Sequence, residues 1–180
     1  MSRLTVLSVN AQNDYYFRNI LNYIVGKDKT PSLMIGAANI LLPQKRRDMF
    51  HAAYKSVYEA MEFYGKEDYR LGIHLIIEFA PSEREYLDGH KMLEIGYEIS
   101  AAAFPGCMTL FGVHEDTDEL HLDMFISTVD LNTGTMYGCN MKGWTSINLV
   151  LQSILMKYMP REALGGIQIS YGKEKRPKRV

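Results

Sequence analysis

Hydrophobic and polar residues recur along the chain with two different periods, which predict strands and helices in turn. Short runs rich in β-branched and aromatic residues predict strands over residues 4–9, 69–80, 108–114, 120–129 and 167–171. Apolar residues at three- and four-residue spacing predict amphipathic helices over residues 15–26, 44–64, 82–104 and 145–158. Residues 32–40 are apolar but interrupted by Gly36, so this segment is predicted to be either a strand or a loop.

Capping signals set the expected ends of two of these helices. Asp14 is expected to cap the first helix, and Gly26 to end it, because glycine is common just after a helix. Ser82 and Glu85 have the spacing of a capping box, so the third helix is expected to begin there. Pro105–Gly106 is expected to end it.

The connections between strands decide the fold class. An acidic turn, residues 115–119, joins two predicted strands, and Asn132–Gly134 predicts a second turn after which residues 135–137 continue a hairpin. Such short connections suit antiparallel neighbours, because a parallel pair needs a crossover of a dozen or more residues. The prediction is an α/β (α+β) fold with a mixed, largely antiparallel sheet and helices on its faces. We expect one domain, residues 1–172, followed by a basic tail, residues 173–180.

Composition supports a single globular domain. The 180 residues are 47% hydrophobic and 23% charged, close to the globular average. Two cysteines, Cys107 and Cys139, are too few for a disulfide scaffold or a four-cysteine zinc site. No apolar run approaches the ~18 residues of a spanning helix, and the first residues lack a signal-peptide pattern. We therefore expect a cytoplasmic protein.

The net charge of −1 does not by itself indicate a nucleic-acid-binding protein. The basic residues are clustered, however, in Lys45, Arg46 and Arg47 and in the tail, residues 173–179. The tail is interpreted either as a solvated chain end or as a segment that contacts phosphates. Any basic surface must therefore be built from local clusters.

A candidate metal site lies in the two predicted strands around the acidic turn. His121 and Asp123 are two residues apart, so their side chains leave the same face of a strand. The turn returns the chain so that His114, at the end of the preceding strand, lies beside them. Imidazole with a carboxylate suits a divalent ion such as Mn²⁺ or Mg²⁺. The competing interpretation is that these are surface residues beside a solvated loop.

Three segments resemble a known family. GVHEDTDELHLDMFISTVDLNTG closely resembles the third motif of the mobilisation relaxases, nucleases of the His-hydrophobic-His (HUH) endonuclease superfamily. YFRNILNYIVGKDKT is similar to the family's first motif, a helix that presents a tyrosine before a lysine-containing turn. HLIIEFAPSE, with LEIGYEISAAAFPG after it, is similar to the family's histidine-containing strand and the next helix. The order and spacing agree over most of the chain.

The resemblance implies a DNA relaxase with an HUH endonuclease-like fold. Such an enzyme is a metal-dependent, site- and strand-specific endonuclease and transesterase. It nicks plasmid or conjugative-element DNA at an origin of transfer through a 5′-phosphotyrosine intermediate. The implied cofactor is a divalent metal, Mn²⁺ or Mg²⁺. The implied partners are single-stranded origin DNA, accessory mobilisation proteins and a coupling protein.

Carried over to this sequence, the resemblance implies a role for several residues. Tyr23 would be the nucleophile, although Tyr15 and Tyr16 on the same helix are rivals. Asp116 would orient a ligand histidine, and His74 would line the site or, as a lone histidine on an apolar strand, belong to the core.

One position departs from the family pattern. His114 and His121 match the metal-binding histidines, but Asp123 stands where the family has its third histidine. This change leaves open a working variant site, a weakened site, or a non-catalytic DNA-binding relative. The sequence is also compatible with an HUH replication initiator and with an unrelated α/β protein whose histidines are incidental.

DNA contacts are expected from basic and aromatic side chains. The candidates for phosphate contacts are Lys27, Lys29, Lys45, Arg46 and Arg47. Tyr15, Tyr16 and Trp144 are candidates for stacking with bases.

Overall fold

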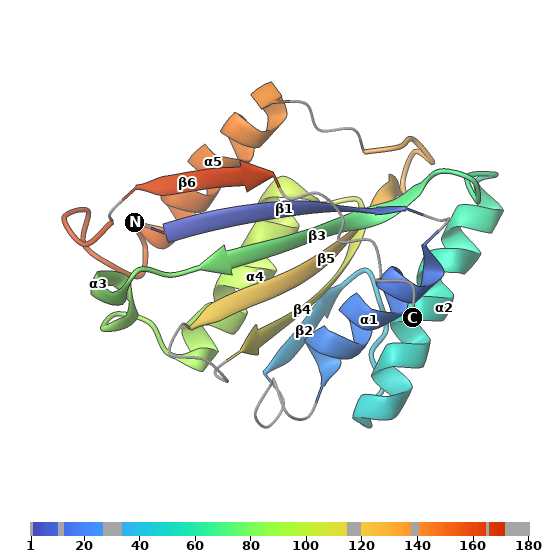
Figure 1. Cartoon of the computed structure of the whole chain (residues 1–180), viewed down its shortest axis with the longest axis horizontal. Helices are drawn as coiled ribbons and strands as arrows, with labels where there is room; N and C mark the ends of the chain where they lie inside the picture. Colours follow the sequence, from blue (N-terminus) through green and yellow to red (C-terminus); the bar gives the residue numbers. More distant parts are fainter. Residues whose placement is uncertain are drawn as a thin grey trace, which may run out of the picture.

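The chain folds around one six-stranded sheet. The structure, a computed structural model, describes residues 2–10, 13–26, 34–114, 120–137, 141–164 and 166–171. The strands are β1 (Ser2–Asn10), β2 (Ile35–Ala38), β3 (Arg70–Glu78), β4 (Cys107–His114), β5 (His121–Asp130) and β6 (Ile167–Tyr171). The helices are α1 (Asp14–Val25), α2 (Arg46–Phe63), α3 (Pro81–Arg84), α4 (Gly89–Ala103) and α5 (Met141–Leu155). The strand order is β2-β4-β5-β3-β1-β6 (Figure 1).

The sheet is antiparallel except at one edge. β3 pairs with β1 and β5, and β4 pairs with β5 and β2, all in antiparallel register. β6 runs parallel to β1 and forms the edge opposite β2. The prediction of a mixed, largely antiparallel sheet is confirmed, and the ambiguous segment 32–40 contains the short strand β2.

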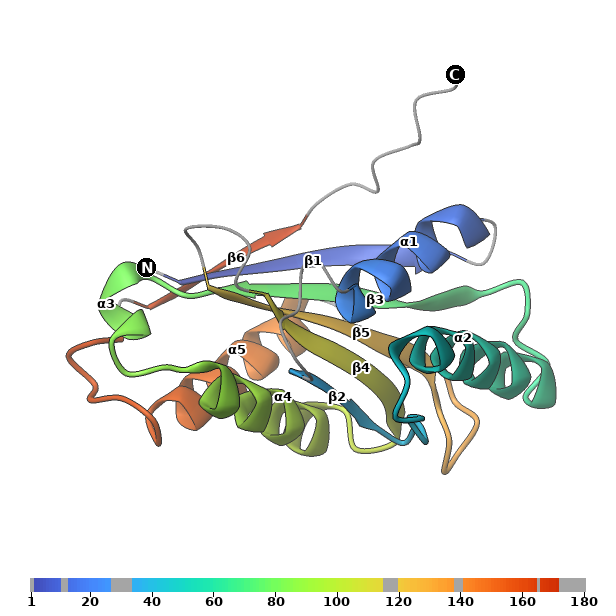
Figure 2. The same cartoon turned by 90° about the horizontal axis from the view of Figure 1, so that it is seen from below.

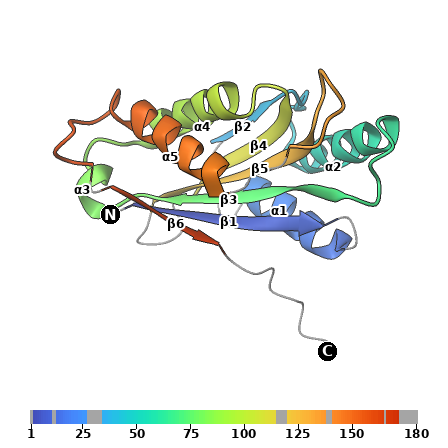
Figure 3. The ribbon, with the colours of Figure 1, turned by 90° about the horizontal axis from the view of Figure 1, so that it is seen from above.

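Helices cover both faces of the sheet. α4 and α5 pack together on one face, which Figures 2 and 3 show, whereas α1 and α2 pack on the other face. Gly96 of α4 lets the ring of Phe111 lie against the helix, because a Cβ there would come within 2.5 Å of that ring. On the other face, Phe17 of α1 contacts Phe125 of β5 with ring centroids 5.0 Å apart. The apolar core on this second face therefore fixes the position of α1 relative to β5.

The first helix begins and ends almost as predicted. Asn13, not Asp14, is the N-cap, and its side chain accepts a hydrogen bond from the backbone N–H of Tyr16. Asp14 is the first helical residue, and its carboxylate instead accepts hydrogen bonds from other side chains. Gly26 is the C-cap, as predicted.

The helix predicted over residues 82–104 is two helices, so this prediction is wrong. Buried Glu83, not Glu85, accepts a hydrogen bond from the backbone N–H of Ala80 and a second one from the hydroxyl of Ser2. This anchor holds the short helix α3 against the start of β1. Asp88 then caps α4 as a new helix start.

The last part of the chain differs from the prediction mainly at element boundaries. α5 begins at Met141 rather than near residue 145. The hairpin expected at 135–137 is reduced to one bridge, between Val129 and Met136. In the part of the chain that the structure describes, no helix combines the length and the apolar character needed to cross a membrane.

Candidate active site

The candidate metal-binding residues lie where β4 ends and β5 begins. His114 is the last residue of β4 and His121 is the first of β5, and the two are direct cross-strand partners. Their imidazole rings lie with centroids 5.0 Å apart. Asp123 follows two residues along β5, so its side chain projects from the same face as that of His121.

These three side chains converge on one point. The Oδ2 atom of Asp123 lies 3.2 Å from Nδ1 of His114 and 3.2 Å from Nε2 of His121. One ligand atom from each of the three residues lies within 4.8 Å of the others. His114 is 0%, Asp123 1% and His121 8% exposed, so these residues do not form a solvated surface beside the loop.

The donor set fits a metal ion. Both ring nitrogens of His114 and the Oδ2 atom of Asp123 are buried, and among the described residues they have no hydrogen-bond partner. Buried polar atoms nearly always have a hydrogen-bond partner. These atoms of His114 and Asp123 lie close together without forming hydrogen bonds to each other, so they are available to bind a further ligand. Two imidazole nitrogens with one carboxylate oxygen suit Mn²⁺ and related divalent ions.

His74 holds the other oxygen of the same carboxylate. It lies on β3, next to β5 in the sheet, and its Nε2 atom is 2.6 Å from Oδ1 of Asp123. Burial alone would raise the pKa of the Asp123 carboxyl. The contacts with His114, His121 and His74 outweigh burial and hold that pKa well below its usual value. Asp123 is therefore ionised, as a metal ligand must be.

Tyr23 lies directly beside this group. It is on the last turns of α1, and its ring meets the ring of His114 edge-on, with centroids 4.4 Å apart and planes at 76°. Tyr15 is 64% exposed, and eight residues of helix place it about 12 Å along α1 from Tyr23. Tyr16 packs partly into the core between α1 and α2. Among the three candidate tyrosines, Tyr23 is the one whose ring contacts a histidine of the candidate metal site, His114.

The basic residues predicted to bind DNA are only partly described. Lys27, Lys29, Asp116 and the tail, residues 173–180, lie outside the described residues. Lys45, Arg46 and Arg47 lie at the start of α2, and Nη1 of Arg46 donates to the carbonyl oxygen of Gly26 at 3.2 Å. Among the predicted stacking residues, Trp144 is 4% exposed in the core beneath α5, so its predicted role in stacking is wrong.

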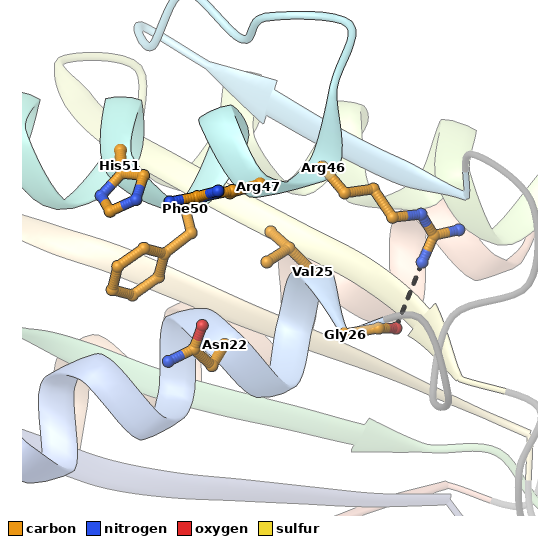
Figure 4. Close-up of a pocket in the computed structure, with 7 residues that line it drawn as sticks. All are labelled: Asn22, Val25, Gly26, Arg46, Arg47, Phe50 and His51. Carbon is orange, nitrogen blue, oxygen red and sulfur yellow. Dashed lines mark hydrogen bonds between the residues drawn. The ribbon is translucent and has the colours of Figure 1, made fainter.

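A pocket beside Tyr23 was not predicted from the sequence. It has a volume of 460 Å³ and lies between the end of α1 and the start of α2 (Figure 4). Its lining residues are Asn22, Val25, Gly26, Arg46, Arg47, Phe50 and His51. The helical spacing of Arg47 and His51, four residues apart, could have grouped these two side chains. The contact between α1 and α2 that creates the pocket cannot be predicted from a local sequence pattern.

Comparisons with known proteins identify the family. The model of the relaxase family, described as the MobA/VirD2-like nuclease domain, matches residues 23–159. The protein rlx of Staphylococcus aureus is 29% identical over 105 residues, which are 58% of this chain and 31% of that protein. The chain thus matches about a third of this curated relative's length.

Solved structures share the fold. One comes from a study of the molecular basis of vancomycin resistance transfer in Staphylococcus aureus, with a TM-score of 0.62 and 9% identity over 93% of this chain and 97% of that one. Another is a MobM relaxase domain bound to plasmid origin-of-transfer DNA in a manganese-bound crystal structure. It matches with a TM-score of 0.57 and 14% identity over 99% of this chain and 93% of that one. Because the family model covers more than half of the chain, the protein belongs to the MobA/VirD2-like relaxase nuclease-domain family.

Proposed function

We propose that this chain nicks one strand of plasmid or conjugative-element DNA at an origin of transfer, with Tyr23 as the nucleophile. The observation that carries the proposal is the edge-on contact between Tyr23 and His114, 4.4 Å between ring centroids, within a buried group that can hold a metal. The match to the family model begins at residue 23, so it includes Tyr23 and not Tyr15 or Tyr16.

His114, His121 and Asp123 would hold the metal. The manganese in the related MobM structure supports Mn²⁺, and the carboxylate of Asp123 is compatible with Mn²⁺ or Mg²⁺. When bound, the ion supplies positive charge that polarises and positions the scissile phosphate. With an aspartate in place of the family's third histidine, the site keeps a buried, ionised oxygen donor, which favours a working site over a non-catalytic relative.

Tyr23 would carry the covalent step. Its phenolic oxygen forms a bond to phosphorus as the bond from phosphorus to the 3′ oxygen breaks, which leaves a 5′-phosphotyrosine and a free 3′-hydroxyl. The phenol loses its proton to solvent, and the departing 3′ oxygen gains one. The ring contact with His114 holds the half-buried Tyr23 beside the proposed metal ligands, which reduces the motion needed to orient the attack.

Origin-of-transfer DNA, cut in one strand, is the proposed substrate, because the related MobM domain is bound to plasmid origin-of-transfer DNA. Lys45, Arg46 and Arg47 would contact phosphates near Tyr23, and Lys27 and Lys29 are proposed to add to the same basic surface. Asp116 is proposed to orient a ligand histidine. Accessory mobilisation proteins and a coupling protein are proposed partners of the assembly that processes the DNA.

The test is covalent capture of DNA. The natural chain is incubated with Mn²⁺ and a pool of labelled single strands of random sequence, and adducts that survive denaturing detergent are isolated and sequenced. We expect adducts that share a short sequence, and no adduct with Tyr23→Phe. Tyr16→Phe is the matched control on the same helix and should keep the adduct.

The outcomes separate the candidate functions. Adduct that persists in Tyr23→Phe and disappears in Tyr16→Phe would assign the nucleophile to Tyr16. Binding of a defined sequence without any adduct, at any divalent ion tested, would replace the nuclease with a non-catalytic DNA-binding relative.

A further inference from the structure

We propose that the pocket between α1 and α2 binds one unpaired base of the DNA strand, next to the nicked bond, and so reads sequence. This inference rests on the proposed function, since the base belongs to the strand that Tyr23 would cut. The pocket is lined by residues of both helices, and Figure 4 shows the side chains of Asn22 and Phe50 turned toward the space between them.

The position of the pocket makes the occupant a neighbour of the nick. Asn22 and Gly26 line the pocket, and Tyr23 lies between them on α1. Gly26 follows Tyr23 by about one helical turn, roughly 5 Å, so the edge of the pocket lies close to the backbone that carries Tyr23. A base that enters the pocket is therefore expected to belong to a nucleotide near the attacked phosphate.

The walls suit a planar, partly apolar ligand. The pocket volume of 460 Å³ falls in the roughly 300–1,000 Å³ range of small-ligand sites. Val25 and the ring of Phe50 supply apolar walls, and the Phe50 ring is held by a stack with Tyr54, whose centroid is 5.9 Å away. An aromatic wall with a fixed orientation is a stacking surface for a base.

The rim supplies hydrogen-bonding groups and positive charge. The Asn22 amide offers both donors and an acceptor, and the His51 ring lies edge-on to Phe50 at 5.1 Å. Arg46 is oriented by its hydrogen bond to the Gly26 carbonyl. Within the described chain, Arg47 forms no ion pair or hydrogen bond, so its guanidinium can contact the phosphate attached to the base. The one acidic residue in the first turn of α2, Asp48, does not line the pocket.

The test combines abasic substitutions with pocket variants. Strands are selected for binding from a random single-stranded pool with Tyr23→Phe, so that recovery does not depend on cleavage. Each nucleotide of the selected strand is then replaced by an abasic one, and affinities are measured by fluorescence anisotropy. We expect one position, beside the nicked bond, where loss of the base weakens binding by about 5- to 150-fold, the range for one lost base stack.

The pocket variants should remove this effect at that position alone. In Phe50→Leu and Asn22→Ala, each made in the Tyr23→Phe chain, the abasic strand and the intact strand should bind equally well. Phe63→Leu is the matched control, because Phe63 ends α2, is 80% exposed and does not line the pocket. Asn22 is exposed, so its variant keeps the test informative if Phe50→Leu unfolds.

Two results would overturn the proposal. One is an abasic penalty that persists unchanged in both pocket variants, because the base then lies elsewhere. The other is binding of free deoxynucleoside monophosphates that depends on Phe50 while no abasic position matters, because the pocket then holds a separate nucleotide. The proposed function is tested separately: the natural chain, which keeps Tyr23, should form a covalent adduct with the selected strand.

Discussion

The two oxygens of the Asp123 carboxylate have different neighbours: Oδ1 lies 2.6 Å from Nε2 of His74, whereas Oδ2 faces His114 and His121. His74 comes from a different strand, so the orientation of the Asp123 carboxylate on β5 depends on the packing of β3 against β5. Residues that orient metal ligands are commonly needed for tight binding. We therefore propose that His74 positions the Asp123 carboxylate rather than being an incidental core histidine.

His74→Phe is expected to weaken Mn²⁺ binding by about 10- to 100-fold, because the carboxylate loses the contact that orients it. The change is measured by titrating Mn²⁺ and following its electron paramagnetic resonance signal. His90→Phe is the control, since His90 is exposed on α4. Unchanged Mn²⁺ affinity, together with a lower melting temperature, would assign His74 a purely structural role.

Metal binding is expected to stabilise the folded chain. Mn²⁺ at about 100 times its dissociation constant adds about 2.7 kcal/mol, because it binds the folded state and not the unfolded one. For a chain of this size the melting temperature should rise by about 5–10 °C, measured by differential scanning calorimetry. His121→Ala should abolish the rise, and His90→Ala should keep it. An equal rise in His121→Ala would place the metal elsewhere.

The grouping of His114, His121 and Asp123 was predictable because their spacing is local. His121 and Asp123 share a strand face by simple alternation, and the acidic turn brings His114 back beside them, so a sequence pattern sufficed. The family resemblance implies that His74 lines the site, but its contact with Asp123 depends on the register of β3 against β5. That register is set by side chains far apart in sequence, which no local pattern records.

The features that the sequence predicts wrongly or does not predict also depend on contacts between residues far apart in the chain. Buried Glu83 accepts a hydrogen bond from Ser2, 81 residues away, and this long-range contact within α3 has no counterpart in the local capping signals, which predict one continuous helix. Trp144 is predicted to lie on an exposed face, yet it is 4% exposed and belongs to the core to which α4 and α5 contribute. The pocket between α1 and α2 likewise exists only after the two helices pack.

Asp123→His, which restores the family's third histidine, is expected to change metal preference. A third imidazole favours ions such as Co²⁺ and Zn²⁺, whereas a carboxylate favours Mg²⁺ and Mn²⁺. The ratio of Mg²⁺ to Co²⁺ affinity, measured by competition in thermal-shift titrations, should therefore fall at least about tenfold. Asp123→Asn, which keeps the shape but removes the charge, should weaken binding of all these ions. A ratio that stays the same in Asp123→His would show that Asp123 does not bind the metal.

Asp14 ties the helix that carries Tyr23 to α2. Its carboxylate accepts hydrogen bonds from the hydroxyls of Tyr54 at 2.8 Å and Tyr58 at 3.0 Å, and from Arg18 at 2.6 Å. Partial burial acts to raise the pKa of Asp14, but these hydrogen bonds outweigh it and lower that pKa. The folded state therefore prefers the ionised carboxylate.

Asp14→Asn should lower the free energy of unfolding at pH 7 by about 1 kcal/mol. This value is modest because the ion pair between Asp14 and Arg18 is partly exposed to solvent. Because the folded-state pKa is depressed, the contribution of Asp14 is complete above its unfolded-state pKa and is lost as the pH falls through the folded-state value. Urea unfolding should therefore show a difference between the natural chain and Asp14→Asn at pH 7 that shrinks toward pH 3. Glu59→Gln, on the exposed face of α2, should show little difference at either pH. A difference between the natural chain and Asp14→Asn that stays constant from pH 7 to pH 3 would show that the charge of Asp14 does not join the two helices.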